Sequence, residues 1–136
     1  FDRTWNSKSR YSMDWYYPIL CGVYDTDESK KIIKDKWENF VVPGLGCKCV
    51  EEEPWVTIAE TCELILALNK IGERKLATNL YEDILNLKDK KDNLFWTGFV
   101  YKDHKHWPVE KPSWTAAAVI LAANSLFKLN SNFDFF

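Results

Sequence analysis

The chain has 136 residues, enough for one domain. Hydrophobic residues make up 46% of it and aromatic residues 15%, with only five glycines and five prolines, which excludes disordered, collagen-like and low-complexity proteins. The formal charge of −2 comes from 18 basic and 20 acidic residues mixed along the chain, so we expect no nucleic-acid partner. The longest apolar stretch, residues 116–123, is far shorter than the roughly 20 residues that span a bilayer.

The four cysteines are too few and too irregularly spaced for the disulfide framework of a small secreted protein. We therefore expect reduced thiols in a soluble, cytoplasmic protein without a membrane span. The chain begins with Phe1 rather than methionine, so we also expect it to be part of something longer.

Two helices are predicted in the first third of the chain. Residues 12–24 begin at Ser12, a candidate N-cap, and contain Pro18, which predicts a kink or a delayed start. Residues 26–40 follow Asp25, which has a glutamate three residues later as in a capping box. Their single apolar stripe among charged residues predicts a surface helix.

Three more helices follow in the remainder. Residues 57–71 open with the capping-box pattern Thr57-x-x-Glu60 and are apolar on nearly every face, so we expect a helix that is buried all round. Residues 73–87 return to the amphipathic pattern. Residues 113–128 are again small, apolar and predicted to be buried.

The alternation of buried and exposed helices predicts an all-α protein of helical hairpins, with inner and outer helices, over one domain spanning residues 1–136. A short internal repeat, in which Pro54-x-x-Thr57 aligns with Pro112-x-x-Thr115, supports this arrangement. Antiparallel neighbours place the two long connections, residues 41–56 and 88–112, at the same end. The second connection is predicted to contain a small, irregular β-hairpin around residues 94–101.

Several short stretches resemble a known group of proteins. They are MDWYYP (13–18), PGLG (43–46), PWVTIAETCE (54–63), WTG (96–98), WP (107–108) and WTAAA (114–118). Uncharacterised bacterial proteins labelled prenyltransferase-like contain similar stretches, and these are similar to the α/α-toroid superfamily of terpenoid cyclases and protein prenyltransferases. The resemblance implies a partial α/α toroid whose inner helices line a central cavity. A complete toroid has more hairpins than this chain, which predicts a C-terminal part of a longer ring or a ring completed by self-association.

The catalytic signatures of that superfamily are not found in the chain. Its class II cyclases use Asp-x-Asp-Asp, and the nearest string, DTDE at 25–28, is better explained as a helix N-cap. Its protein prenyltransferases hold zinc with an Asp-x-Cys pair, which Glu60-x-Cys62 matches only loosely. An isoprenoid substrate is therefore implied by the resemblance alone.

Acidic and aromatic residues gather at the predicted loop-bearing end. Three acids, Asp14, Glu60 and Glu63, lie in or near the first turns of inner helices, and two carboxylates across a cavity could act as acid and base on a glycosidic bond. The candidate ligand-binding residues are Trp15, Tyr16, Trp55, Trp96, Tyr101, Trp107, Glu110 and Trp114. The alternative is structural, because the helix dipole favours acids in first turns and tryptophans fill cores.

A zinc site is a second hypothesis. Cys47-x-Cys49 and His104-x-His106 supply four ligand types that suit tetrahedral zinc if the two long connections meet. The alternative is a pair of turn cysteines and a polar loop, so that the protein needs no cofactor.

Three functions stay open from the sequence. The first is a ligand-binding or catalytic part of an α/α-toroid protein that acts on a carbohydrate-like ligand in an acidic, aromatic cavity. The second is a prenyltransferase-like or terpene-cyclase-like protein with an isoprenoid substrate. The third is a non-catalytic module that binds a saccharide, a peptide or a partner helix with the same rim.

Overall fold

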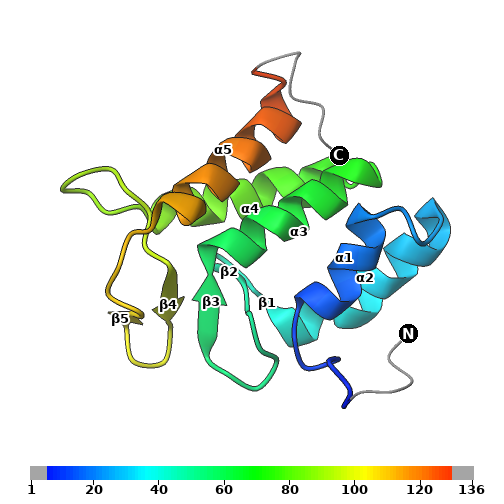
Figure 1. Ribbon diagram of the computed structural model, residues 1–136, viewed down its shortest axis with the longest axis horizontal. Coiled ribbons are helices and arrows are strands. Elements are labelled where there is room, and N and C mark those ends of the chain that lie inside the picture. The colour runs from blue at the N-terminus through cyan, green and yellow to red at the C-terminus, as the bar shows by residue number, and fades with distance from the viewer. Residues whose placement is uncertain (1–5, 130–136) are drawn as a thin grey trace.

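The computed structural model describes residues 6–129, which form five helices and two small antiparallel sheets (Figure 1). The helices are α1 (Met13–Leu20), α2 (Thr26–Phe40), α3 (Ile58–Lys70), α4 (Arg74–Asn86) and α5 (Ser113–Phe127). The strands are β1 (Val41–Val42), β2 (Gly46–Cys47), β3 (Trp55–Thr57), β4 (Gly98–Val100) and β5 (Lys105–His106). All predicted helices are present, so the helical part of the prediction is confirmed, but the domain is mostly helical with small β-hairpins rather than all-α.

The helix ends show which capping predictions hold. The Asp25 side chain accepts a hydrogen bond from the Glu28 N–H at 2.9 Å, as predicted for the start of α2. Ser12 and Thr57 make no side-chain cap, so those two predictions are wrong. Thr57 is the last residue of β3 and its hydroxyl is buried, whereas Ser12 has helical backbone angles itself. Helix α1 ends at Leu20, two residues after Pro18, and so is shorter than predicted.

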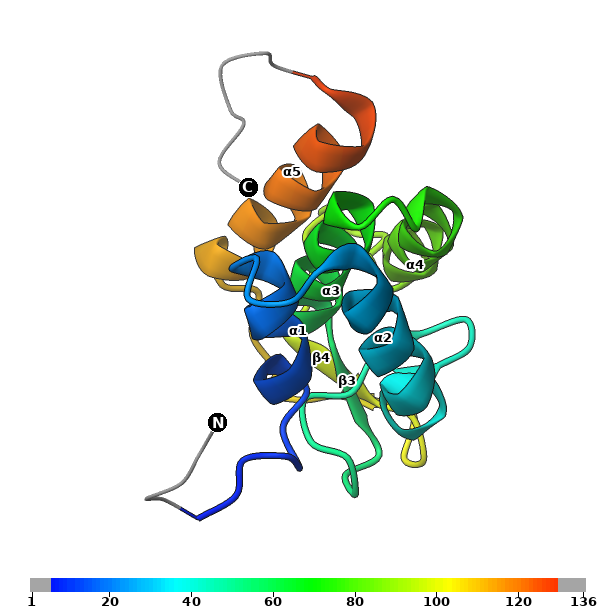
Figure 2. The same cartoon turned by 90° about the vertical axis from the view of Figure 1, so that its right-hand side faces the viewer.

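The helices form two layers, with α1, α3 and α5 in one and α2 and α4 in the other (Figure 2). Helix α3 packs against α1, α4 and α5, and it is buried along nearly its whole length, as the sequence predicts. The described residues contain two hairpins and the further helix α5, which form a stack and no closed ring. Within residues 6–129 no helix is long and apolar enough to cross a membrane.

Helix α5 differs from the prediction that it is buried all round. One face packs against α3 through residues such as Thr115, Val119 and Ala122, but Ile120 on the other face is 66% exposed. Phe127 on the same helix is half exposed. Helix α5 is therefore apolar on all sides, but only one of its faces is covered by neighbouring elements.

A three-stranded sheet ties the two long connections together. Strand β3 pairs with β4 in the register Trp55↔Val100, and β4 pairs with β5. This pairing confirms that both connections lie at one end, and it confirms a hairpin in the second, although its strands begin later than predicted. At Gly98 a Cβ atom would lie 2.4 Å from the indole nitrogen of Trp55, so only glycine lets the strands approach this closely.

A second hairpin, β1–β2, was not predicted and is anchored to α3 by Thr61. The buried Thr61 hydroxyl accepts a hydrogen bond from the Cys47 N–H at 2.8 Å and donates one to the Thr57 carbonyl at 2.6 Å. Gly46 has φ of +130°, and a Cβ atom there would lie 2.6 Å from the Thr61 hydroxyl oxygen. The hairpin, the strand and the helix are therefore joined through one side chain.

We expect Thr61→Val to destabilise the protein by about 1–3 kcal/mol, because it leaves the Cys47 N–H buried without an acceptor. Thr61→Ser keeps the hydroxyl and is the matched control, with a smaller loss. Urea unfolding followed by circular dichroism measures both. A larger loss in Thr61→Ser than in Thr61→Val would show that the methyl group, and not the hydroxyl, matters.

Candidate functional site

A groove of about 510 Å³ lies between α1, α3 and α5, on the side of α3 that its neighbours leave open. Its walls are mostly aliphatic and aromatic. They are formed by Tyr17, Leu20, Cys21, Ala59, Cys62, Glu63, Leu66, Trp114, Ala117, Ala118 and Leu121. Glu63 is the one charged residue among them, so this carboxyl is the polar centre of the groove.

Glu63 extends from α3 toward two consecutive tyrosines of α1. The Tyr16 hydroxyl donates a hydrogen bond to Oε2 at 2.7 Å, and the Tyr17 hydroxyl donates one to Oε1 at 3.1 Å. Burial raises the pKa of Glu63, the two hydrogen bonds oppose that rise, and the nearby Glu60 adds to it. Burial likewise raises the pKa of Tyr17, to about 12, so this tyrosine stays a donor at neutral pH. The carboxyl is thus set up to hold a proton at a higher pH than an exposed glutamate.

Glu60 lies one helical turn before Glu63 but does not line the groove. Its Oε2 atom is buried and has no hydrogen-bond partner within residues 6–129. Burial, together with the charge of Glu60 and a hydrogen bond to it, raises the pKa of Cys49 to about 12. Cys49 is therefore a neutral thiol beside this carboxylate.

The third predicted acid, Asp14, lines a separate hollow of about 420 Å³ along α1. The two hollows share Tyr17 and Cys21 in their walls. The sequence therefore identifies three acids near one helix layer, but the structure does not bring them into one cavity.

Trp15 and Tyr16 belong to the core. Trp15 is 5% exposed and packs against Phe40 with ring centroids 5.6 Å apart, and Tyr16 is fully buried. The prediction that they face a ligand is not what the structure shows. Tyr16 instead reaches the groove indirectly, through its hydrogen bond to Glu63.

The Trp96 ring is contacted by two side chains of the protein. The His106 ring stacks on it at 4.6 Å with an interplanar angle of 15°, and Lys111 Nζ lies over the ring at 4.2 Å. Trp96 therefore already makes stacking and cation–π contacts within the protein.

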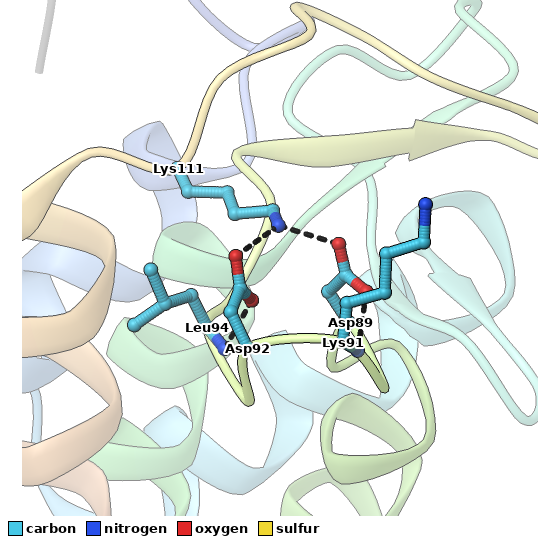
Figure 3. Close-up of polar contacts among 5 residues, drawn as sticks. All are labelled: Asp89, Lys91, Asp92, Leu94 and Lys111. Carbon is cyan, nitrogen blue, oxygen red and sulfur yellow. Dashed lines mark hydrogen bonds and ion pairs between the residues drawn. The ribbon is translucent and has the colours of Figure 1, made fainter.

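Lys111 is itself held by two aspartates of the loop after α4 (Figure 3). Its Nζ donates to Asp89 and to Asp92, the latter at 2.7 Å, while the other oxygens of the two carboxylates accept from the backbone N–H groups of Lys91 and Leu94. The hydrogen bonds from Lys111 lower the pKa of both aspartates, and they raise the pKa of Lys111. The charge of this lysine is neutralised within the protein.

The other predicted ligand residues are divided between two places. Trp107 is 57% exposed beside the three-stranded sheet, where its carbonyl accepts from the Trp55 indole N–H at 2.8 Å. Tyr101 follows β4 in the turn to β5, and Glu110 accepts from the Thr97 hydroxyl at 3.1 Å. Only Trp114, which is 52% exposed, lines the groove with Glu63. Tyr17 was missed, because its partner lies 46 residues away in sequence.

Within the described part of the chain, the four residues of the zinc hypothesis do not come together as one group. Cys47 is buried under α3, whereas His104 is exposed and His106 stacks on Trp96. Residues 6–129 contain no group of three or more His, Cys, Asp or Glu side chains that could hold a metal ion.

The comparisons with known proteins bear directly on the sequence resemblance. No protein-family model matches the chain. Over 120 residues, or 88% of its length, the chain is 48% identical to a protein of Mycolicibacterium hassiacum named MMP endo-(1,4)-3-O-methyl-alpha-D-mannosidase. The match covers 33% of that protein, so the chain spans about a third of the length of the relative.

This relative overturns the proposed kinship with prenyltransferase-like proteins. Its name is that of a carbohydrate-active enzyme, and the identity extends over most of the chain rather than over scattered motifs. The short stretches that resemble prenyltransferase-like proteins include core and strand residues such as Trp15 and Gly98. A match at such residues indicates similar packing and does not indicate a shared reaction.

We expect Glu63→Gln to stabilise the protein at neutral pH and to have no such effect at acidic pH. Because the folded-state pKa of Glu63 is raised, the folded state binds the proton more tightly than the unfolded state, and stability falls as the pH rises through that pKa. The amide avoids this loss, its oxygen still accepts from one tyrosine hydroxyl, and its N–H group can donate to the other. Thermal unfolding between pH 3 and pH 8 measures the difference. A constant difference across this range would contradict the pKa assignment.

Proposed function

We propose that the groove between α1, α3 and α5 binds an α-mannoside chain that carries 3-O-methyl groups, and that Glu63 is the general acid acting on its glycosidic bond. The observation that carries the proposal is a partly buried carboxyl with a raised pKa in an otherwise uncharged groove. The 48% identity to a protein named as a 3-O-methyl-mannosidase supports this ligand class. The broader expectation of a carbohydrate-like ligand agrees with that name.

The walls of the groove suit a methylated sugar better than an unmodified one. A 3-O-methyl group replaces a hydroxyl donor with an apolar methyl, which needs an apolar surface and no hydrogen-bond partner. Leu20, Leu66 and Leu121 provide such a surface. The half-exposed ring of Trp114 lies at the same groove, where it could cover the C–H face of a sugar ring.

Hydrolysis of a glycosidic bond ordinarily uses two carboxyl groups about 5–10 Å apart. Glu63 supplies the proton for the leaving oxygen in this proposal. Asp14 is the proposed second carboxylate, because its hollow meets the groove at Tyr17 and Cys21. Glu60 is proposed to act electrostatically, since its charge raises the pKa of Glu63. The proposed reaction needs no cofactor. The cytoplasmic location of the protein stays a prediction.

We expect an α-(1,4)-linked 3-O-methyl-mannose oligosaccharide to bind the chain more tightly than the same oligosaccharide without methyl groups. Trp114→Ala should weaken binding about five- to tenfold through loss of ring contact. Trp107→Ala is the matched control, because it removes an exposed tryptophan outside the groove. Isothermal titration calorimetry measures these affinities. Equal affinity for both oligosaccharides, or equal effects of both substitutions, would contradict the proposed groove.

The same oligosaccharide tests the role of the acid. We expect Glu63→Gln to keep binding within about twofold but to lower the hydrolysis rate by about 100-fold or more in a protein that hydrolyses it, since a general acid contributes on this scale. Asp14→Asn should act in the same direction. Product release followed by mass spectrometry measures the rate. An unchanged rate in Glu63→Gln would remove Glu63 from the reaction.

We further propose that this stack is part of a larger ring of hairpins, completed by a longer chain or by a second copy. Apolar surface is uncovered at both ends of the inner layer: at α5, where Ile120 and Phe127 are exposed, and at α1, where Val23 borders the hollow that contains Asp14.

We expect the isolated chain to self-associate through this surface at high concentration, and Ile120→Glu to prevent it. Native mass spectrometry measures the masses present, with Lys128→Glu as a control for the added charge. A monomer at all concentrations would contradict association between copies.

A further inference from the structure

Two neighbouring residues of α1 contact the two oxygens of Glu63 in unequal ways. The Tyr16 hydroxyl lies 2.7 Å from Oε2, whereas the Tyr17 hydroxyl lies 3.1 Å from Oε1. Tyr16 is fully buried, and its ring packs edge-on against Trp15 at 5.3 Å. Tyr17 is 42% exposed and lines the groove. One bond is therefore short and enclosed by the core, and the other is longer and open to a ligand.

We propose that Tyr16 is a positioning residue, which holds Oε2 of Glu63 so that Oε1 is presented to the groove, and that Tyr17 gives up its bond to Oε1 when a ligand enters. This inference rests on the proposed function of the groove, and it adds which oxygen transfers the proton and which tyrosine moves.

The placement of the proton follows from the hydrogen bond to Oε2. A neutral carboxyl has one hydroxyl oxygen and one carbonyl oxygen, and the carbonyl oxygen is the better acceptor. Both oxygens accept from a tyrosine, but the bond from Tyr16 to Oε2 is the shorter, so we place the carboxyl proton on Oε1. During the reaction this proton moves from Oε1 to the glycosidic oxygen while the bond between that oxygen and the anomeric carbon breaks. The charge left on Glu63 is then stabilised by the Tyr16 hydroxyl.

Among the described residues, no positively charged side chain competes with the two tyrosine hydroxyls for the Glu63 carboxyl. On α3 its titratable neighbours are Glu60 and Cys62, and from the other elements they are Tyr16, Tyr17 and Cys49. Burial raises the pKa of both cysteines, so they are neutral near pH 7. The residues with which α5 lines the groove carry no charge. Glu60 is thus the one charged group among these neighbours, and the tyrosine hydroxyls are the donors.

Tyr16→Phe and Tyr17→Phe form a matched pair, because each removes one hydroxyl and keeps the ring. The readout is the titration of Glu63 followed by NMR with ¹³C-labelled glutamate, assigned by its loss in Glu63→Gln. We expect both substitutions to raise the pKa of Glu63 in the free protein, and Tyr16→Phe to raise it more. With saturating 3-O-methyl-mannose oligosaccharide, the rise should persist in Tyr16→Phe and disappear in Tyr17→Phe, since Tyr17 has already released Oε1.

Two results would overturn the inference: a larger rise for Tyr17→Phe in the free protein, or a rise in Tyr17→Phe that persists with the ligand bound. Absence of oligosaccharide binding would contradict the proposed function, while the free-protein comparison still tests the role of Tyr16. The wild type provides a measurement that needs no substitution. A slowly exchanging Tyr16 hydroxyl proton should be visible in the proton spectrum with and without ligand, and its loss on ligand binding would also contradict the inference.

Discussion

Helix α3 has to be buried on almost every side, and this constraint determines where the other elements lie. A helix with so many apolar residues needs neighbours in two layers, and α1, α5 and α4 supply them. These neighbours still leave a gap between α1 and α5. The groove occupies this gap, and Glu63 is the charged residue that lines it. The site is therefore a direct consequence of how α3 is covered.

Glu63 is held in a position that costs stability when it is ionised. Among the described residues, its neighbours include another carboxylate and two thiols but no cation, and the two tyrosine hydroxyls offset only part of the cost of burial. A purely structural acid at this place would gain from a lysine partner, as Asp89 and Asp92 do with Lys111. The contrast between these two sites favours a functional role for Glu63 and a structural role for the aspartates.

The sequence predicted the helices well because their signals are local. Apolar patterns and candidate caps along the sequence marked all five helices, and Asp25 marked the start of α2 with its own side chain. The prediction from sequence failed where one residue contributes to two secondary-structure elements. Thr57 looks like an N-cap, but it ends strand β3, and the hydroxyl that joins the strand to the helix belongs to Thr61. The hairpin β1–β2 has strands of two residues, too short for any alternation to show. The site was predicted in part, since Glu63 and Trp114 were named but Tyr17 was not.

The aromatic residues show why composition alone misplaced the site. Tryptophans are abundant at the loop-bearing end, yet Trp96 is covered by His106 and Lys111, and Lys111 is fixed in turn by two carboxylates. That end of the molecule holds the two long connections together through a sheet. A ligand needs aromatic faces that are free, and the sequence does not distinguish a free ring from a covered one. The free ring beside the carboxyl is that of Trp114, on a helix whose outer face still lacks a neighbour. In the proposed ring, a further hairpin would pack against this outer face, where Ile120 and Phe127 are exposed, while the groove lies along Trp114, Ala117 and Leu121 of the same helix.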